Sequence, residues 1–94
     1  MMNFIHENNK IYLQDDNSHM IAVVTFPKET ENVVNIDHTY VDGSLRGQGI
    51  AGKLMEETVA QLRENNLKAK PTCSYAVKWF SEHPECSDVL FNAF

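Results

Sequence analysis

A glycine-rich stretch near the middle of the chain has the residue types that hold an anion. Residues 42–53 contain all four glycines of the protein, and Arg46 and Lys53 are the only charged side chains from Gly43 to Met55. Glycine lets a backbone bend sharply and approach a ligand closely. The apolar residues that follow repeat with a helical period, and the first turn of a helix offers free N–H groups at the positive end of its dipole. The stretch therefore predicts a cradle for a phosphate or pyrophosphate.

Two known phosphate motifs fit this stretch poorly. A P-loop requires Gly-Lys followed by Ser or Thr, and the chain lacks that sequence here. Gly47, Gly49 and Gly52 match Gly-x-Gly-x-x-Gly, but no complete strand–helix–strand unit surrounds them and the acidic residue that binds a ribose is missing. On glycine content alone, a turn that only reverses the chain is the alternative.

The elements that must position the cradle follow from the apolar pattern. Within the strand predicted over Val33–Val41, Val34, Ile36, His38 and Tyr40 share one face by the period of two. The predicted order is β-β-β-β-α-β-α in an α+β (mixed α/β) domain, with a parallel pair of strands flanking the long helix. The strands are expected at 4–7, 10–14, 20–26, 33–41 and 67–73, and the helices from Ala51 to Asn65-Asn66 and over Tyr75–Glu82, the second capped by Ser74.

Composition restricts the class of protein. The 94 residues predict a single domain over residues 1–94, and the net charge of −5 disfavours a nucleic-acid partner. The longest apolar run, residues 20–24, is too short to span a membrane. The two cysteines have no Cys-x-x-Cys spacing and the histidines are scattered, so we expect reduced thiols, no metal site and a cytoplasmic protein.

Four blocks of sequence resemble a known family. Arg46-x-x-Gly49-x-Ala51 matches the [Gln/Arg]-x-x-Gly-x-[Gly/Ala] signature of the GCN5-related N-acetyltransferases (GNAT), and the chain looks most like their small YjdJ-type branch. This resemblance implies a minimal GNAT fold, in which an antiparallel meander leads to fourth and fifth strands that are parallel and splayed. The blocks are His38-Thr39-x-Val41, Gly47-Gln48-Gly49-Ile50-Ala51, Pro71-x-Cys73-Ser74-Tyr75 and His83-Pro84-Glu85.

The resemblance implies where acetyl-CoA binds. Its pantetheine arm would pair with the free edge of the fourth strand, at Thr39, Tyr40 and Val41. Its thioester would then point toward Cys73. Its pyrophosphate would accept hydrogen bonds from the cradle, which consists of Arg46, Gly47, Gln48, Gly49, Ile50, Ala51 and Gly52.

Three side chains are candidates for the catalytic work. Cys73 stands before a predicted helix start, which favours the thiolate. Its alternative roles are to line the site, to accept the acetyl group or to protonate the departing CoA thiolate, and the structural alternative is a small buried residue. His38 has a suitable pKa for a base, but a packed histidine is the alternative reading. Tyr75 is a proton donor to the thiolate by resemblance, or packs the last helix on the sheet.

The expected function is acetyl-CoA-dependent transfer of an acetyl group to an unidentified amine, carried by a small molecule or a protein. The alternatives are a module that binds CoA or acetyl-CoA without efficient turnover, and an interaction domain with no nucleotide ligand. Family members usually have two helices between the first and second strands, and Asn8-Asn9 leaves no room for them. The acceptor and the oligomeric state, monomer or weak dimer through the apolar tail at 88–94, stay open.

Overall fold

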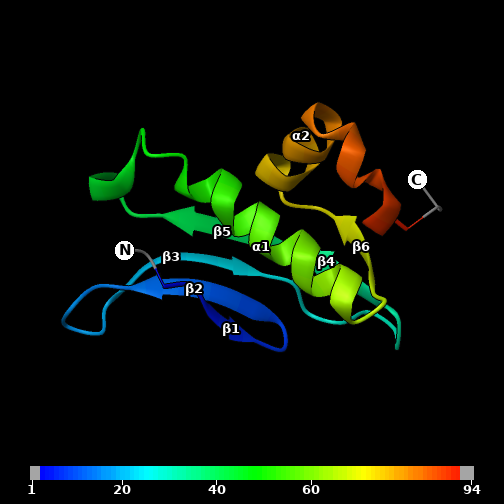
Figure 1. Ribbon diagram of the computed structural model, residues 1–94, viewed down its shortest axis with the longest axis horizontal. Helices are drawn as coiled ribbons and strands as arrows, with labels where there is room; N and C mark the ends of the chain where they lie inside the picture. The colour runs from blue at the N-terminus through cyan, green and yellow to red at the C-terminus, as the bar shows by residue number, and fades with distance from the viewer. Residues whose placement is uncertain (1–2, 92–94) are drawn as a thin grey trace.

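The computed structural model describes residues 3–91, so residues 92–94 of the apolar tail lie outside it. Most strands form one antiparallel sheet, in the order β1-β2-β3-β5, in which β3 lies between β2 and β5 (Figure 1). The hairpin between β1 and β2 turns through Asn8 and Asn9, although neither residue has a positive φ. The strands of this sheet are β1 (Ile5–Glu7), β2 (Lys10–Gln14), β3 (Met20–Thr25) and β5 (His38–Val41).

Two further strands form a small parallel sheet. β4 (Val33–Ile36) pairs with β6 (Lys68–Pro71), in a register that places Val34 beside Ala69. Between them in the chain lies α1 (Ile50–Glu64), which confirms the predicted parallel pair flanking the long helix. The helix ends as predicted, at Asn65, and Asn66 takes the left-handed conformation with φ of 56°.

The single strand predicted over residues 33–41 is wrong in one respect: Asp37 divides it into β4 and β5. The N–H of Asp37 donates to the carbonyl oxygen of Thr25 at 3.2 Å, and its carboxylate accepts the Thr25 hydroxyl at 2.6 Å. One extra residue reverses the alternation of side chains. Ile36 is therefore buried, whereas His38 and Tyr40, which were expected on the same face, are exposed.

The core lies between the antiparallel sheet and α1. Leu54, Met55 and Leu62 of α1 are fully buried against inner-face residues of the sheet such as Ile11 and Val24. This burial explains the apolar period of α1, since about 25 cal/mol is gained for each Å² of apolar surface removed from water. The one buried polar side chain of this core, Thr58, donates its hydroxyl to the carbonyl of Leu54 at 2.8 Å.

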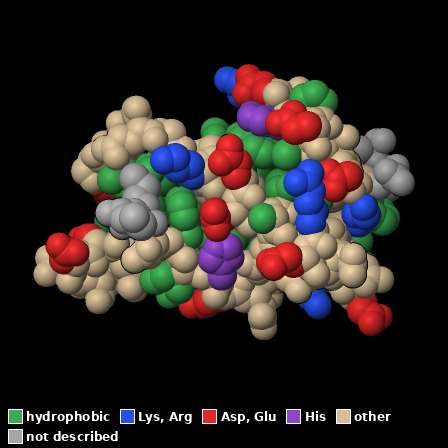
Figure 2. Space-filling view, in the orientation of Figure 1, with side chains coloured by type: hydrophobic (Ala, Val, Ile, Leu, Met, Phe, Trp, Pro, Cys, Tyr) green, Lys and Arg blue, Asp and Glu red, His purple; other side chains and the backbone are tan. Residues whose placement is uncertain are grey.

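The C-terminal part packs beside α1 and β6. It consists of α2 (Ser74–Glu82) and the 3₁₀ helix η2 (Pro84–Val89). Arg63 of α1 holds η2 through two hydrogen bonds to Asp88, from Nε at 3.0 Å and Nη2 at 2.7 Å. The hydrogen bond from Arg63 is the main cause that lowers the pKa of the Asp88 carboxyl. On the face shown in Figure 2, acidic and basic side chains are interspersed, in keeping with a net charge of −5.

Candidate functional site

The loop before α1 is shaped by two glycines in left-handed conformations. Gly47 has φ of 82° and Gly49, which caps α1, has φ of 71°. Other residues adopt such angles only at a cost of about 1–2 kcal/mol, so glycine is needed to bring the chain around into the helix. A β-carbon added at Gly47 or Gly49 would meet nothing within 4 Å. The backbone at this turn is therefore open on that side.

The N–H groups at the mouth of α1 are free within the part of the chain that the structure describes. The first hydrogen bond of the helix runs from the N–H of Lys53 to the carbonyl of Gly49 at 3.1 Å. Arg46 donates its N–H to Gly43 at 3.2 Å, and among residues 3–91 the N–H groups of residues 47–52 donate to no protein acceptor. Such groups attract an anion that supplies several acceptor oxygens.

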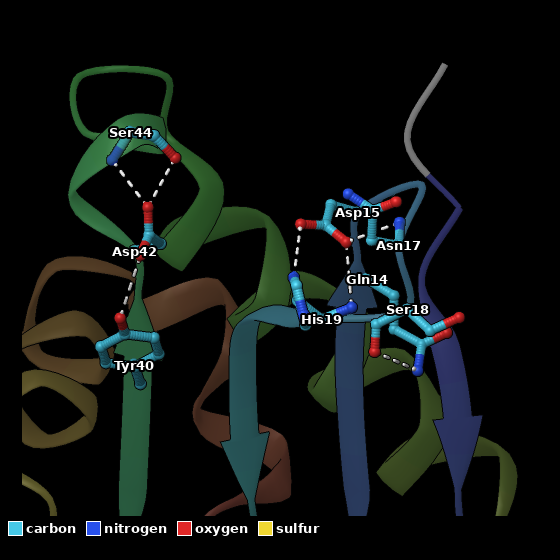
Figure 3. A network of polar contacts seen from close by, with 8 residues as sticks. All are labelled: Gln14, Asp15, Asn17, Ser18, His19, Tyr40, Asp42 and Ser44. Atoms are coloured by element: carbon cyan, nitrogen blue, oxygen red, sulfur yellow. Dashed lines mark hydrogen bonds and ion pairs between the residues drawn. The ribbon is translucent and has the colours of Figure 1, made fainter.

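The charges around this mouth also suit an anion. The first turn of α1 contains no acidic residue. The carboxylate that precedes the loop, Asp42, is already occupied, since it accepts from the N–H of Ser44 at 3.0 Å, the Ser44 hydroxyl at 2.6 Å and the Tyr40 hydroxyl at 3.2 Å (Figure 3). The Ser44 hydroxyl is the main cause that lowers the pKa of Asp42, and Arg46 contributes. Asp42 thus caps the short 3₁₀ helix η1 (Gly43–Leu45) and fixes the approach to the cradle.

A cleft of about 230 Å³ opens beside this mouth. One side is the loop and the start of α1, and the other is formed by β5 and α2. Tyr75 of α2 lines the cleft, and its hydroxyl lies 3.9 Å from where a β-carbon on Gly52 would stand. Burial is the main cause that raises the pKa of Tyr75, so the hydroxyl stays a proton donor near pH 7. The lining residues are Val41, Leu45, Arg46, Gly47, Gly49, Ile50, Ala51, Gly52 and Tyr75.

The edge of β5 that faces away from β3 carries unpaired main-chain groups. Asp42 donates its N–H to Ile21 at 2.8 Å, and the antiparallel register continues with Tyr40 opposite Val23. Main-chain groups alternate in direction along a strand, so those of Tyr40 point to β3 while those of Thr39 and Val41 point away from it. The structure therefore turns Thr39 and Val41 toward the cleft side, but not Tyr40, whose side chain is on the outer face.

Cys73 lies where the two sheets separate. The N–H groups of Cys73 and Thr72 both donate to the carbonyl of Ile36, each at 3.1 Å, which joins the end of β6 to the last residue of β4. The Thr39 hydroxyl of β5 is 3.5 Å from the Cys73 sulfur. The predicted cap was wrong by one residue, because Cys73 rather than Ser74 takes the N-cap of α2.

The environment of the Cys73 sulfur favours the thiolate. Burial is the largest single influence on its pKa and acts to raise it, but the hydrogen bond with the Thr39 hydroxyl and the nearby N–H groups of Ala76, Tyr75 and Thr39 together lower it further than burial raises it. The sulfur makes no short capping hydrogen bond to α2, so the N–H groups of Tyr75 and Ala76 act on it mainly as aligned dipoles. The net result is a thiol with a pKa below its ordinary value.

The structure does not place His38 near the Cys73 sulfur. Thr39 faces the inner side of the sheet with its partner Val24, so the neighbouring His38 faces the outer side with Thr25. His38 is also exposed, which excludes the packed histidine considered from the sequence. The physical reason is the extra residue at Asp37, which turns His38 away from the face that holds Ile36.

Sequence reasoning missed two contributors to this region. The sequence predicted a role only for the main-chain groups of Thr39. The contact of its side chain with Cys73 requires the break in the strand at Asp37. Asp42 has a signal in the sequence, since Asp is a favoured N-cap residue whose side chain accepts from an N–H of the first turn. Among residues 3–91 no three His, Cys, Asp or Glu side chains are grouped as a metal site would require, and neither helix has the length and apolar character needed to cross a bilayer.

Comparisons with known proteins agree on one family. A model of the GCN5-related N-acetyl-transferases matches residues 10–89. Protein NATD1 from Homo sapiens is 35% identical over 66 residues, which are 70% of this chain and 58% of that protein. Protein NATD1 from Gallus gallus is also 35% identical, over 60% of its length, so the chain spans about 60% of the curated relatives it matches.

Solved structures share the fold. The NMR structure of a GCN5-like protein from Staphylococcus aureus has a TM-score of 0.80 and 35% identity, covering 98% of this chain and 90% of that one. The Escherichia coli N-acetyltransferase YhbS, crystallised in complex with CoA, has a TM-score of 0.58 and 26% identity, covering 66% of this chain and 38% of that one. The splayed sheets, the glycine-rich helix mouth and these similarities lead to one conclusion: the chain belongs to the GCN5-related N-acetyltransferase family.

Proposed function

We propose that the protein is an acetyl-CoA-dependent N-acetyltransferase that moves an acetyl group from CoA to an amine. The observation that carries the proposal is the set of free N–H groups of residues 47–52 at the mouth of α1, beside a cleft of about 230 Å³. In this proposal the CoA pyrophosphate accepts from these N–H groups, and the Arg46 guanidinium adds positive charge. The CoA bound in the related E. coli structure supports this ligand class.

The remaining site residues follow from this placement of the pyrophosphate. The pantetheine amides pair with the free main-chain groups of Thr39 and Val41, as an added strand would. The thioester then reaches the point where β5 and β6 separate, near Cys73. A main-chain N–H on the free edge of β5 is suited to donate a hydrogen bond to the thioester oxygen as the amine attacks, which stabilises the tetrahedral intermediate.

The leaving CoA thiolate needs a proton, and two side chains of this chain are near. Tyr75 is protonated near pH 7 and lies in the cleft, so it is our first candidate for the donor. Cys73 lines the site at the end of β6, and acetyl transfer through its sulfur is the alternative role. His38 is on the opposite face of the sheet and serves the reaction only if the acceptor amine approaches from that side.

A CoA titration tests the ligand. Resonances of residues 46–52 should move in an amide spectrum at millimolar CoA, and AMP should leave them in place. At a CoA concentration of 100 times Kd, binding stabilises the native state by about 2.7 kcal/mol. The melting temperature should therefore rise by about 10 °C or more. Unmoved loop resonances would end the proposal.

A second candidate is a module that holds acetyl-CoA without efficient transfer. It is favoured by the direct hairpin between β1 and β2, which leaves no helices there to help form an acceptor site. Incubation with acetyl-CoA and a panel of amines and peptides decides between the two. Release of free thiol that depends on the acceptor supports the enzyme, and release no faster than in buffer supports the module.

We also propose a cytoplasmic location. Cys73 and Cys86 are both free thiols, which suits a reducing compartment.

A further inference from the structure

The contact between Thr39 and Cys73 joins the two sheets at the candidate site. Thr39 belongs to β5 of the antiparallel sheet, while Cys73 follows β6 of the parallel one, and Oγ1 lies 3.5 Å from Sγ. Both side chains are partly buried. Side chains from two different sheets meet in this way only because Asp37 reverses the alternation, which turns Thr39 rather than His38 inward.

The direction of this hydrogen bond depends on the state of the sulfur. A hydroxyl is a stronger donor than a thiol, and a thiolate has no proton to donate. When Cys73 is ionised, the Thr39 hydroxyl must therefore be the donor.

The backbone fixes the other side of the sulfur. Cys73 and Thr72 donate their N–H groups to the carbonyl of Ile36, each at 3.1 Å, and α2 begins at the next residue. The sulfur therefore has little freedom along the chain, and its remaining freedom is rotation about the Cα–Cβ bond. The hydroxyl of Thr39 is placed to select among those rotamers.

We infer that Thr39 is a positioning residue: its hydroxyl holds the Cys73 sulfur in place where β5 separates from β6. The importance of this for acetyl transfer rests on the proposed function. The hold on the sulfur itself does not, since it is a property of the protein without ligand. It assigns to Thr39 a second task, in addition to pairing with pantetheine through its backbone.

The other ionisable groups near Cys73 do not compete with this role. Burial and hydrogen bonds set the pKa of Cys73, and no charged neighbour is among the main causes. Of the titratable side chains on the surrounding elements, Lys70 of β6 pairs with Glu29 at 3.2 Å, and His38 of β5 faces the opposite side of its sheet. Tyr75 on α2 stays neutral in the pH range of the test, since burial raises its pKa.

The test measures the rate at which iodoacetamide alkylates Cys73 as a function of pH. All proteins carry Cys86→Ser so that one thiol reacts, and Cys73→Ala gives the background. Thr39→Val removes the hydroxyl and keeps the shape, and Thr39→Ser keeps the hydroxyl. We expect Thr39→Val to move the midpoint of the pH–rate profile up by about one unit, the size expected for a lost hydrogen bond to a charged acceptor that is partly exposed. Thr39→Ser should stay within about 0.3 unit of the parent.

The outcomes separate positioning from packing. A profile of Thr39→Val that coincides with the parent overturns the inference, and so does an equal shift in Thr39→Ser, because the methyl group would then be responsible. If Thr39→Val fails to fold, as shown by its amide spectrum, Thr39→Ala against Thr39→Ser gives the same comparison. The assay contains no CoA, so a protein that binds no CoA but shows the shift refutes the proposed function and leaves the positioning role intact.

Discussion

Gln48→Glu should weaken CoA binding without harming the fold. Gln48 is exposed, directly precedes the N-cap Gly49, and lies next to the free N–H groups at the mouth of α1. The change keeps the shape of the side chain and adds one negative charge. A carboxylate near a helix N-terminus stabilises the helix by about 0.3–1 kcal/mol, so the melting temperature should hold or rise by a few degrees.

The effect on CoA has the opposite sign. If the added carboxylate lies about 7 Å from a bound diphosphate, in a medium of effective dielectric constant about 40, each phosphate charge is repelled by about 1.2 kcal/mol. Two charges then cost about 2.4 kcal/mol, which corresponds to about 50-fold weaker binding. Calorimetry or amide shifts at low ionic strength measure the change, which should shrink as salt is added.

Asn32→Asp is the matched control for this experiment. It adds the same charge at an exposed residue near the other end of α1, where the carbonyl of Asn32 accepts the N–H of Lys68 at 2.9 Å. A helix of 15 residues is about 22 Å long, so a carboxylate at that end is largely screened from the mouth. Equal loss of CoA affinity in both variants, or no loss in Gln48→Glu, would refute the placement of the pyrophosphate at this helix mouth.

Three further predictions concern stability. Gly47→Ala should lower the free energy of unfolding, measured by urea denaturation, by about 1–2 kcal/mol, because Gly47 has a φ of 82°. Gly43→Ala is the control in the same loop: the φ of Gly43 is not positive, so the free energy of unfolding should change little. Leu54→Ala should cost about 2–5 kcal/mol by the same measurement, because the side chain is fully buried, and a smaller loss would mean that the core collapses around the gap. Asp88→Asn should lower the melting temperature at pH 7. Since Arg63 depresses the pKa of Asp88 in the folded state, the difference from the parent should diminish as the pH falls below about 3.9 and vanish below the folded pKa. A difference that does not diminish as the pH falls would exclude this ion pair as its cause.

Much of the fold could be predicted from local pattern. The helical period from Ala51 to Leu62, the left-handed Asn66 and the two-residue hairpin are all set by residues close in sequence, and each is present in the structure. The division of the fourth strand could not be predicted in this way. In the sequence, Val34, Ile36, His38 and Tyr40 fit one continuous alternation, and the extra residue at Asp37 is detectable only through its contacts with Thr25, 12 residues earlier.

The same distinction applies to the candidate site. The glycine-rich cradle is a local feature, so its open N–H groups could be anticipated from glycine spacing before a helix. The side chains that surround Cys73 could not be predicted from the sequence, because a shift of one residue along the strand decides whether Thr39 or His38 faces inward. The identity of the N-cap of α2 is a similar case, since Cys73 takes it only after its N–H is fixed to Ile36.

The division of the strand at Asp37 has a mechanical consequence. Each half of residues 33–41 keeps its own ladder, β4 with β6 and β5 with β3, so within this segment a single residue, Asp37, separates the two ladders. A change in the angle between the sheets would break neither ladder. Across the gap it would disturb the contact between Thr39 and Cys73, so this contact depends on the width of the opening between β5 and β6.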